Sequence, residues 1–295
     1  MSNFAIVTDS ACDLCKEFRQ EHGIDYARMM LSWTTKEGQT KEISASLDWE
    51  EVSSKEFYDI IRSGIRIYTA QITKQNYLDT FEPHLQNGED VLYIACSSGL
   101  SASLKTAQLL AQEELKEKYP NNKVVVLDSL RAGMAEGLIV MDAVKLKEEG
   151  KSLEEVIDFV EKGKLRYQEI GIPETLSYLK RAGRVTAPQA FFGNMIQLKP
   201  ILQFDDEGKN NTELRVFGRN KAYEKMAEII ASKIDDPENQ EIYLMNADCT
   251  EKDIELFKKY ILKAVKVKDI IALPLGPIIG ASSGPGTIIV NYKIK

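Results

Sequence analysis

The sequence has no long apolar run. None of its apolar stretches approaches the roughly 18–20 residues that a helix needs to cross a bilayer. The first residues, MSNFAIVTDS, lack the basic start and long apolar stretch of a secretory signal peptide. Basic residues are also outnumbered: 38 Lys and Arg stand against 45 Asp and Glu, so the formal net charge is −7, which disfavours a phosphate-binding surface. We therefore expect a cytoplasmic protein with no stable membrane insertion and no nucleic-acid partner.

Histidine and cysteine are scarce, with two and four residues respectively. Cys96 lies inside an apolar, strand-like run, so a disulfide framework is not expected. Cys12-x-x-Cys15 has the spacing of a redox pair or of half a zinc site. The sequence has neither a second C-x-x-C nor an H-x-x-x-H to complete a zinc site. We interpret the pair as coincidental and predict no metal site.

The common motifs of nucleotide and hydrolase chemistry are missing too. There is no G-x-x-x-x-G-K-[ST], no G-x-G-x-x-G and no G-x-S-x-G. We therefore expect no cofactor and no catalytic residue. An alternative stays open, because Asp9 and Asp128 follow predicted strands and could hold Mg²⁺ for a phosphatase or transferase. Aspartates at strand ends more often cap the helix that follows.

Buried strands and helices alternate through the first half of the chain. Strand-like runs occur at Phe4–Thr8, Val91–Cys96 and Lys123–Leu127. Long helices are predicted at Ala132–Glu149 and after the capping box Ser152-x-x-Glu155. This alternation predicts an α/β domain with a parallel sheet, which we assign to residues 1–166.

The pattern changes after about residue 166. Two strand-like runs flank a polar tip and predict an antiparallel hairpin, at Ile201–Phe204 and Glu213–Phe217. Helical patterns at Tyr223–Ile234 and Asp253–Ala264 then alternate with strands at Ile242–Asn246 and Ile270–Pro274. We assign residues 167–295 to a second α/β domain with a mixed sheet.

Polar side chains follow three of the predicted parallel strands. Thr8-Asp9-Ser10, Ser97-Ser98 and Asp128-Ser129 would gather at the edge where such sheets bind ligands. Ser101, at the start of the next helix, is explained as an N-cap, but the Ser97-Ser98-Gly99 turn before it is not.

An apolar segment stands out further along, in ETLSYLKRAGRVTAPQAFFGNMIQLK. Arg184 begins a loop there, and a cluster of large apolar residues follows: Phe191, Phe192, Met195 and Ile196. Core packing and the wall of an apolar ligand pocket both explain this cluster, and the choice stays open.

Several motifs, taken in order, resemble the DegV family, the fatty-acid-binding proteins of bacteria. Thr8-Asp9-Ser10 with Asp13 resembles the family's T-D-S-x-x-D, and Ser97 to Ser101 is similar to S-S-x-L-S. Further on, LSYLKRAGRV resembles L-x-x-L-x-x-G-G-R-[IV], and GPG at 284–286 is similar to the closing G-P-G. The sequence departs from the family at Ser282, where many members carry histidine, and at Ala70 in the T-S-Q-P stretch.

The resemblance implies two α/β domains with a long-chain fatty acid buried between them. It also implies a carrier subunit that presents the carboxylate to a separate ATP-binding fatty acid kinase subunit, for phospholipid synthesis. The resemblance places the carboxylate at Thr69 and at Ser97 or Ser98, and we add Ser282 as a further hydroxyl donor. Acyl-chain lining is expected from Phe191, Phe192, Met195, Ile196, Leu198 and Ile278, and a surface for the partner or its phosphate from Arg184, Arg215 and Lys221. The departures leave open a different apolar carboxylic acid as ligand.

A fatty acid sets two physical requirements. Burying roughly fifteen methylene-sized groups gains on the order of 12 kcal/mol before association costs, so the tail needs only a dry cavity. The ionised head cannot be buried without partners. Hydroxyl groups and turn amides bind it without the strength of a full ion pair, and on this basis we predict that the Ser97-Ser98-Gly99 turn binds a carboxylate.

Overall fold

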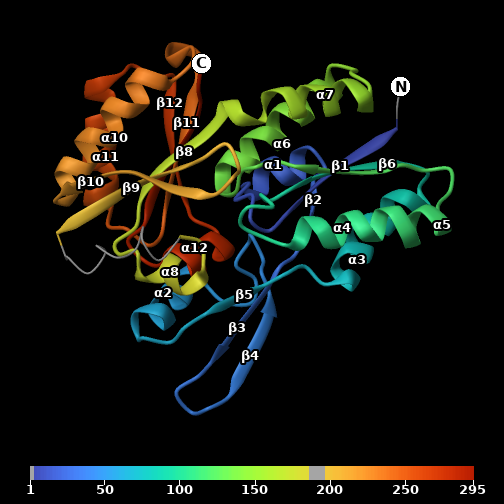
Figure 1. Ribbon diagram of the computed structural model, residues 1–295, viewed down its shortest axis with the longest axis horizontal. Coiled ribbons are helices and arrows are strands. Elements are labelled where there is room, and N and C mark those ends of the chain that lie inside the picture. Colours follow the sequence, from blue (N-terminus) through green and yellow to red (C-terminus); the bar gives the residue numbers. More distant parts are fainter. Residues whose placement is uncertain (1–2, 186–196) are drawn as a thin grey trace.

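The computed structural model describes residues 3–185 and 197–295 of the chain (Figure 1). Its first sheet has four parallel strands in the order β2-β1-β6-β7. These strands are β2 (Asp25–Ala27), β1 (Phe4–Asp9), β6 (Asp90–Ala95) and β7 (Val124–Asp128). β1 is buried along its whole length because it lies between β2 and β6 and is covered on both faces. The parallel sheet predicted for the first half is confirmed.

Helices cover both faces of this sheet. On one side lie α6 (Gly133–Glu148) and α7 (Leu153–Gly163), the latter opened by the predicted capping box of Ser152 and Glu155 (Figure 1). On the other side lie α3 (Lys74–Gln86) and α4 (Ser103–Leu110), and α4 continues through a π-helical turn (Ala111–Leu115) into α5 (Lys116–Lys118). A short helix, α1 (Lys16–Glu21), follows β1.

A small antiparallel sheet extends from the body of the protein (Figure 1). It has the order β4-β3-β5, with β3 (Met30–Thr34), β4 (Thr40–Ser44) and β5 (Tyr68–Ala70). α2 (Ser54–Arg62) lies between β4 and β5 in the sequence. Since β5 pairs with β3 through Leu31 and Thr69, this sheet fixes the position of one predicted ligand-binding residue.

The second half forms a six-stranded mixed sheet in the order β10-β9-β8-β13-β11-β12. The strands are β8 (Tyr167–Ile172), β9 (Leu198–Phe204), β10 (Asn210–Phe217), β11 (Glu241–Asn246), β12 (Asp269–Pro274) and β13 (Ile288–Lys293). β11 and β12 are parallel and the other pairs are antiparallel, so the predicted mixed sheet and the predicted β9–β10 hairpin are both confirmed.

The two faces of the six-stranded sheet have different partners. Ile170 of β8 and Val290 of β13 belong to one apolar cluster with residues of α10 (Arg219–Lys233) and α11 (Glu251–Ala264). Side chains alternate along a strand, so Glu169 and Gly171 of β8 face the other way. That second face is turned toward the first half of the chain, where Ile289 packs in one cluster with β1 and β6.

A late helix, α12 (Pro277–Ser283), joins the two halves. It contacts α2, β5 and α8 (Ser177–Ala182). Just before it, the N–H of Gly276 donates to Asp13 Oδ1 at 3.2 Å, and the Tyr58 hydroxyl donates to Leu275 O at 3.1 Å. The sheets divide near residue 166, because β8 begins at Tyr167, whereas the apolar core is continuous across this point. The division into domains 1–166 and 167–295 stays our proposal.

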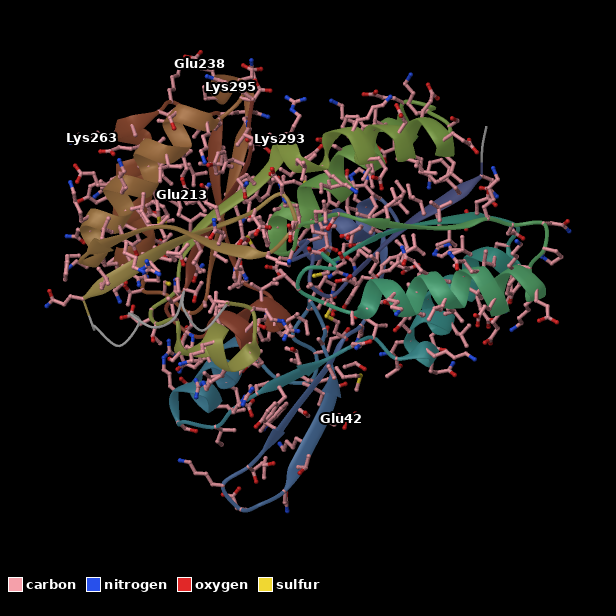
Figure 2. The ribbon with its side chains drawn as sticks, in the orientation of Figure 1. Glu42, Glu213, Glu238, Lys263, Lys293 and Lys295 are labelled. Carbon is pink, nitrogen blue, oxygen red and sulfur yellow. The ribbon has the colours of Figure 1, made fainter. Side chains whose placement is uncertain are left out.

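Charged side chains lie on the outer surfaces, as on the projecting hairpin at Glu42 and on α11 at Lys263 (Figure 2). The described residues also form two short 3-10 helices, Lys164–Arg166 and Pro237–Asn239. Within the described ranges, no helix is both long and apolar enough to cross a membrane.

Candidate functional site: a cavity between the two halves

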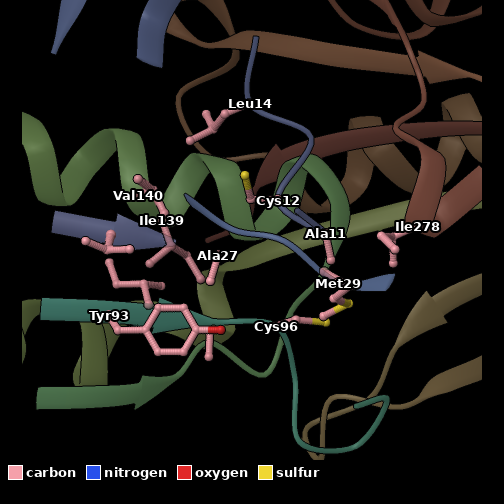
Figure 3. Packing of buried hydrophobic residues seen from close by; sticks show 14 of the residues in the cluster. Ala11, Cys12, Leu14, Ala27, Met29, Tyr93, Cys96, Ile139, Val140 and Ile278 are labelled. Atoms are coloured by element: carbon pink, nitrogen blue, oxygen red, sulfur yellow. The ribbon is translucent and has the colours of Figure 1, made fainter. Parts of the chain in front are cut away.

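A largely apolar cavity of about 400 Å³ lies between the inner face of the six-stranded sheet and the first half of the chain. This volume falls within the range of small-molecule sites. Apolar lining residues come from both halves and include Met29, Cys96, Leu100, Leu202, Phe204 and Ile278. Figure 3 shows that Met29, Cys96 and Ile278 come from three separate parts of the chain. The cavity exists only because these segments meet.

Three predicted residues meet at one end of this cavity. Thr69 of β5, Arg184 after α8 and Ser282 of α12 line both the large cavity and a smaller neighbour of about 140 Å³. Within the described residues, neither the Thr69 nor the Ser282 hydroxyl makes a hydrogen bond. Two available hydroxyls beside a guanidinium form a suitable environment for an anionic head group.

The smaller cavity carries two further arginines, Arg66 and Arg181. Arg66 Nη2 donates to the Arg181 carbonyl at 2.5 Å, and its guanidinium lies 4.2 Å from the centre of the Tyr68 ring. The Arg181 guanidinium likewise lies over the Tyr178 ring, 4.7 Å from the centre of the ring. Neither arginine was predicted as a site residue. The contact between Arg66 and Arg181 joins positions 115 residues apart, so no local sequence pattern indicates it.

The Ser97-Ser98 pair does not line the cavity. Ser97 is fully buried, and its hydroxyl donates to the Gly208 carbonyl, at the tip of the β9–β10 hairpin, at 2.8 Å. Ser98 is exposed, and its backbone N–H donates to Asp128 Oδ1 at 3.2 Å. The Ser97 hydroxyl therefore attaches the hairpin to this turn. The expected carboxylate contact of Ser97 and Ser98 has no support from the lining of the cavity.

The next residues of that turn do reach the cavity. Leu100, Ser101 and Ala102 are part of the lining. Ser101 does not cap the helix by itself, since α4 begins two residues later, at Ser103. The Ser101 hydroxyl accepts from the Ser103 N–H at 3.2 Å and donates to the Ser103 hydroxyl at 3.0 Å. Ser101 is therefore a polar lining residue that our candidate set did not contain.

The predicted acyl-chain lining has a mixed outcome. Ile278 lines the cavity, one helical turn before Ser282 on α12. Leu198 begins β9 opposite Phe217 and is not among the lining residues. The remaining four candidates, Phe191, Phe192, Met195 and Ile196, lie outside the described residues.

Two predicted partner-facing residues lie elsewhere on the surface. Arg215 is exposed on the edge strand β10. Lys221 is exposed on α10 and forms an ion pair with Glu224, with Nζ and Oε2 separated by 2.6 Å. Neither lines the cavities that Arg184 joins.

The two strand-end aspartates hold turns in place. Asp9 is buried and accepts hydrogen bonds from the N–H groups of Ala11 and Cys96 and from the Tyr93 hydroxyl, each at 2.9 Å. Burial raises the pKa of Asp9 above its ordinary value, against these hydrogen bonds. Asp128 accepts from the N–H groups of Ser98 and Leu130. The favoured role as helix caps is wrong, because α1 begins after Cys15 and α6 after Ala132; the two aspartates instead hold the turns that follow β1, β6 and β7.

One ionisable side chain in the cavity wall was not predicted. Glu169 of β8 lines the cavity and is 7% exposed. Burial raises the pKa of Glu169 to about 8, although the Arg131 guanidinium opposes this shift. This raised pKa favours the protonated carboxyl at neutral pH, in a wall that is largely apolar.

The fold and the cavity agree with the similarity of this chain to known proteins. A sequence profile described as "Uncharacterised protein, DegV family" matches residues 3–294. The chain belongs to the DegV family. A DegV domain-containing protein of Clostridium perfringens is 32% identical over 292 residues, which cover 99% of this chain and 98% of that protein.

Solved DegV-family structures share the fold. A structure from Thermus thermophilus, described as showing fatty acid binding, is 26% identical with a TM-score of 0.83, and covers 99% of this chain and 100% of that one. A DegV lipid-binding protein from Thermotoga maritima is 25% identical with a TM-score of 0.82, covering 100% and 99%. The predicted two-part α/β DegV fold is therefore confirmed.

Proposed function

We propose that this protein is a fatty-acid-binding carrier. Its largely apolar cavity would bury the acyl tail, and its polar end would bind the carboxylate. The observation that carries the proposal is the meeting of Thr69, Arg184 and Ser282 at one end of a 400 Å³ apolar cavity. The fatty-acid and lipid binding described for the two related structures supports it.

The polar end suits a carboxylate that must later react. Two hydroxyls can donate to the carboxylate oxygens, and hydrogen bonds to charged groups contribute about 1.5–3 kcal/mol each. Arg184 adds positive charge, although its Nη1 also donates to the Ala182 carbonyl. The carboxylate would thus lie at the boundary between the two cavities rather than deep in the protein.

We further propose that the carboxylate is presented to a separate ATP-dependent fatty acid kinase subunit. The small cavity beyond Thr69 and Ser282 would then receive the phosphoryl group, with Arg66, Arg181 and Arg184 lining it. Guanidinium groups suit phosphate oxygens because of their planar, two-pronged donor geometry. In this proposal the chain holds the substrate, and catalytic groups are supplied by the partner.

The Mg²⁺-dependent phosphatase alternative has less support. The buried Asp9 accepts three hydrogen bonds and the half-buried Asp128 accepts two. Neither residue lines the cavity. Chelator separates the two functions: a carrier binds palmitate or oleate equally well with and without EDTA.

A direct experiment tests the carrier function. The full chain is purified, extracted with organic solvent, and the extract is analysed by mass spectrometry for long-chain acids. The delipidated protein is then titrated with palmitate and oleate by calorimetry. Co-purified acid and saturable binding at one site support the proposal, whereas an empty protein that binds neither acid but hydrolyses phosphate esters would overturn it.

A further inference from the structure

The interior of the cavity contains a carboxyl group that a plain hydrocarbon chain cannot satisfy. Glu169 lines the large cavity but not the small one, whereas Thr69, Arg184 and Ser282 line both. Glu169 is therefore separated from the proposed head-group end. The Glu169 carboxylate lies beside Gly133 at the start of α6, with its Oε2 3.9 Å from where a Cβ on Gly133 would be.

The fold provides no hydrogen-bond donor for this carboxyl within the described residues. The cation whose charge acts on Glu169 is Arg131, which is buried. Arg131 uses its N–H groups on backbone carbonyls instead: Nε donates to Tyr167, Nη2 to Leu165 at 3.1 Å, and Nη1 to Leu130 at 2.6 Å. The Glu169 carboxyl is thus available to whatever occupies the cavity.

The other groups around Glu169 do not supply a donor either. Asp13, from the loop after β1, lies near the same position beside Gly133, and the charge of Glu169 raises the pKa of Asp13 further. From β13 the residue opposite is the uncharged Asn291, whose Nδ2 donates to the Tyr243 carbonyl at 3.4 Å. Of these neighbours Arg131 alone is a cation, and Asp13 alone is a second acid.

We propose that Glu169 is a specificity-determining residue that hydrogen-bonds to an oxygen atom on the ligand's chain, so that the cavity takes acyl chains bearing a hydroxyl or oxo group. This inference rests on the proposed function and names the ligand class within it. A buried polar group left unpaired disfavours a ligand that cannot pair with it, so such a site rejects the plain analogue.

At neutral pH the Glu169 carboxyl can hydrogen-bond to a hydroxyl oxygen and to an oxo oxygen. A protonated carboxyl donates one O–H and keeps an accepting oxygen, so it can pair with an oxo group or a hydroxyl. An ionised carboxylate only accepts, so it can pair with a hydroxyl but not with an oxo group. Because the pKa of Glu169 is about 8, binding of an oxo-substituted chain should depend on pH near this value, whereas binding of a hydroxy-substituted chain should not.

Competition binding on the delipidated full chain tests this inference. Stearate is compared with hydroxystearates and oxostearates substituted at successive positions along the chain. We expect substitution at one window of positions to tighten binding by at least about tenfold over stearate. The oxostearate advantage should disappear as pH rises through about 8, while the hydroxystearate advantage persists.

Two matched variants complete the experiment. Glu169→Gln keeps a donor and an acceptor at every pH, so it should retain the preference for both oxygenated chains and lose its pH dependence. Glu169→Leu should remove the preference and bind stearate more tightly. Thermal melting of both variants verifies that they are folded.

The possible outcomes separate this inference from the proposed function. If stearate binds but no oxygenated chain binds better, in wild type and in Glu169→Gln alike, the inference is wrong and the carrier function stands. If none of the acids binds, the carrier function itself fails.

Discussion

Ser97 donates its hydroxyl hydrogen to the carbonyl oxygen of Gly208, across 2.8 Å and 111 positions of sequence. The contact joins the turn after β6 to the tip of the β9–β10 hairpin, and so joins the two halves beside the cavity. Gly208 has a φ of +71°, and a Cβ there would lie 2.1 Å from Ser97 Oγ. Glycine is thus required at this position, because the backbone is left-handed and because a Cβ would collide with Ser97 Oγ.

This contact predicts a stability effect without a direct ligand effect. Ser97→Ala leaves the buried Gly208 carbonyl without its donor, so we expect the free energy of unfolding to fall by about 1–3 kcal/mol. Ser98→Ala, on the exposed neighbour, should change it by less than about 0.5 kcal/mol. Urea unfolding of the delipidated variants measures both. Equal stability of the two variants would contradict the structural role of Ser97.

The fold could be predicted well because its signals are local. Alternating buried strands and amphipathic helices predicted the parallel sheet, and the polar tip at 205–212 predicted the β9–β10 hairpin. The capping box at Ser152 needs only four adjacent residues and is present as expected. Such patterns act over short distances, so they can be recognised without knowledge of the tertiary contacts.

The site was predicted only in part because its contacts are long-range. Thr69 and Ser282 line the cavity, and their binding of a carboxylate stays a prediction. The Ser97 hydroxyl bonds to Gly208, a distant residue that no local sequence pattern indicates as its partner. Glu169 was missed for a similar reason. It reads as a polar residue in the strand YQEIGI, and only the packing of the first half onto that face buries it.

Thr69 gives a direct test of the head-group end. Thr69→Val preserves shape and removes the hydroxyl, so we expect carboxylate binding to weaken by at least about 1 kcal/mol. Thr69→Ser keeps the hydroxyl and serves as the matched control. Calorimetric titration with palmitate measures both, and palmityl alcohol should discriminate less between the variants because it lacks the charge. Unchanged palmitate affinity in Thr69→Val would remove Thr69 from the site.

Arg184 gives a test of the proposed partner. It is the predicted partner-facing residue that lines both cavities, whereas Lys221 lies on α10 in an ion pair with Glu224. We expect Arg184→Ala to weaken association with the kinase subunit or to slow acyl phosphate formation by about tenfold or more. Lys221→Ala should have little effect. If Arg184→Ala leaves both the affinity and the rate unchanged, the proposed role of Arg184 is wrong.

Glu169 also makes a prediction about stability and pH. The pKa rises from 4.5 in an ordinary environment to about 8 in the fold, so between these values the folded protein binds more protons at this site than the unfolded chain does. Stability must then fall as pH increases through this window, by up to about 1.4 kcal/mol per pH unit, and level off above it. Glu169→Gln removes this contribution, so its curve should fall less steeply than that of wild type.

Urea unfolding of delipidated protein at several pH values between about 4 and 9 measures this difference, since a bound ligand would add its own stabilisation. Asp13 and Glu136 are buried carboxyl groups with raised pKa values and contribute slopes of the same sign, so only the difference between variant and wild type isolates Glu169. Glu42→Gln, on the exposed hairpin, is the control and should follow wild type. Parallel curves for wild type and Glu169→Gln would mean that Glu169 is ionised in the folded protein at neutral pH. The carboxylate could then donate no hydrogen bond to an oxo group in the cavity.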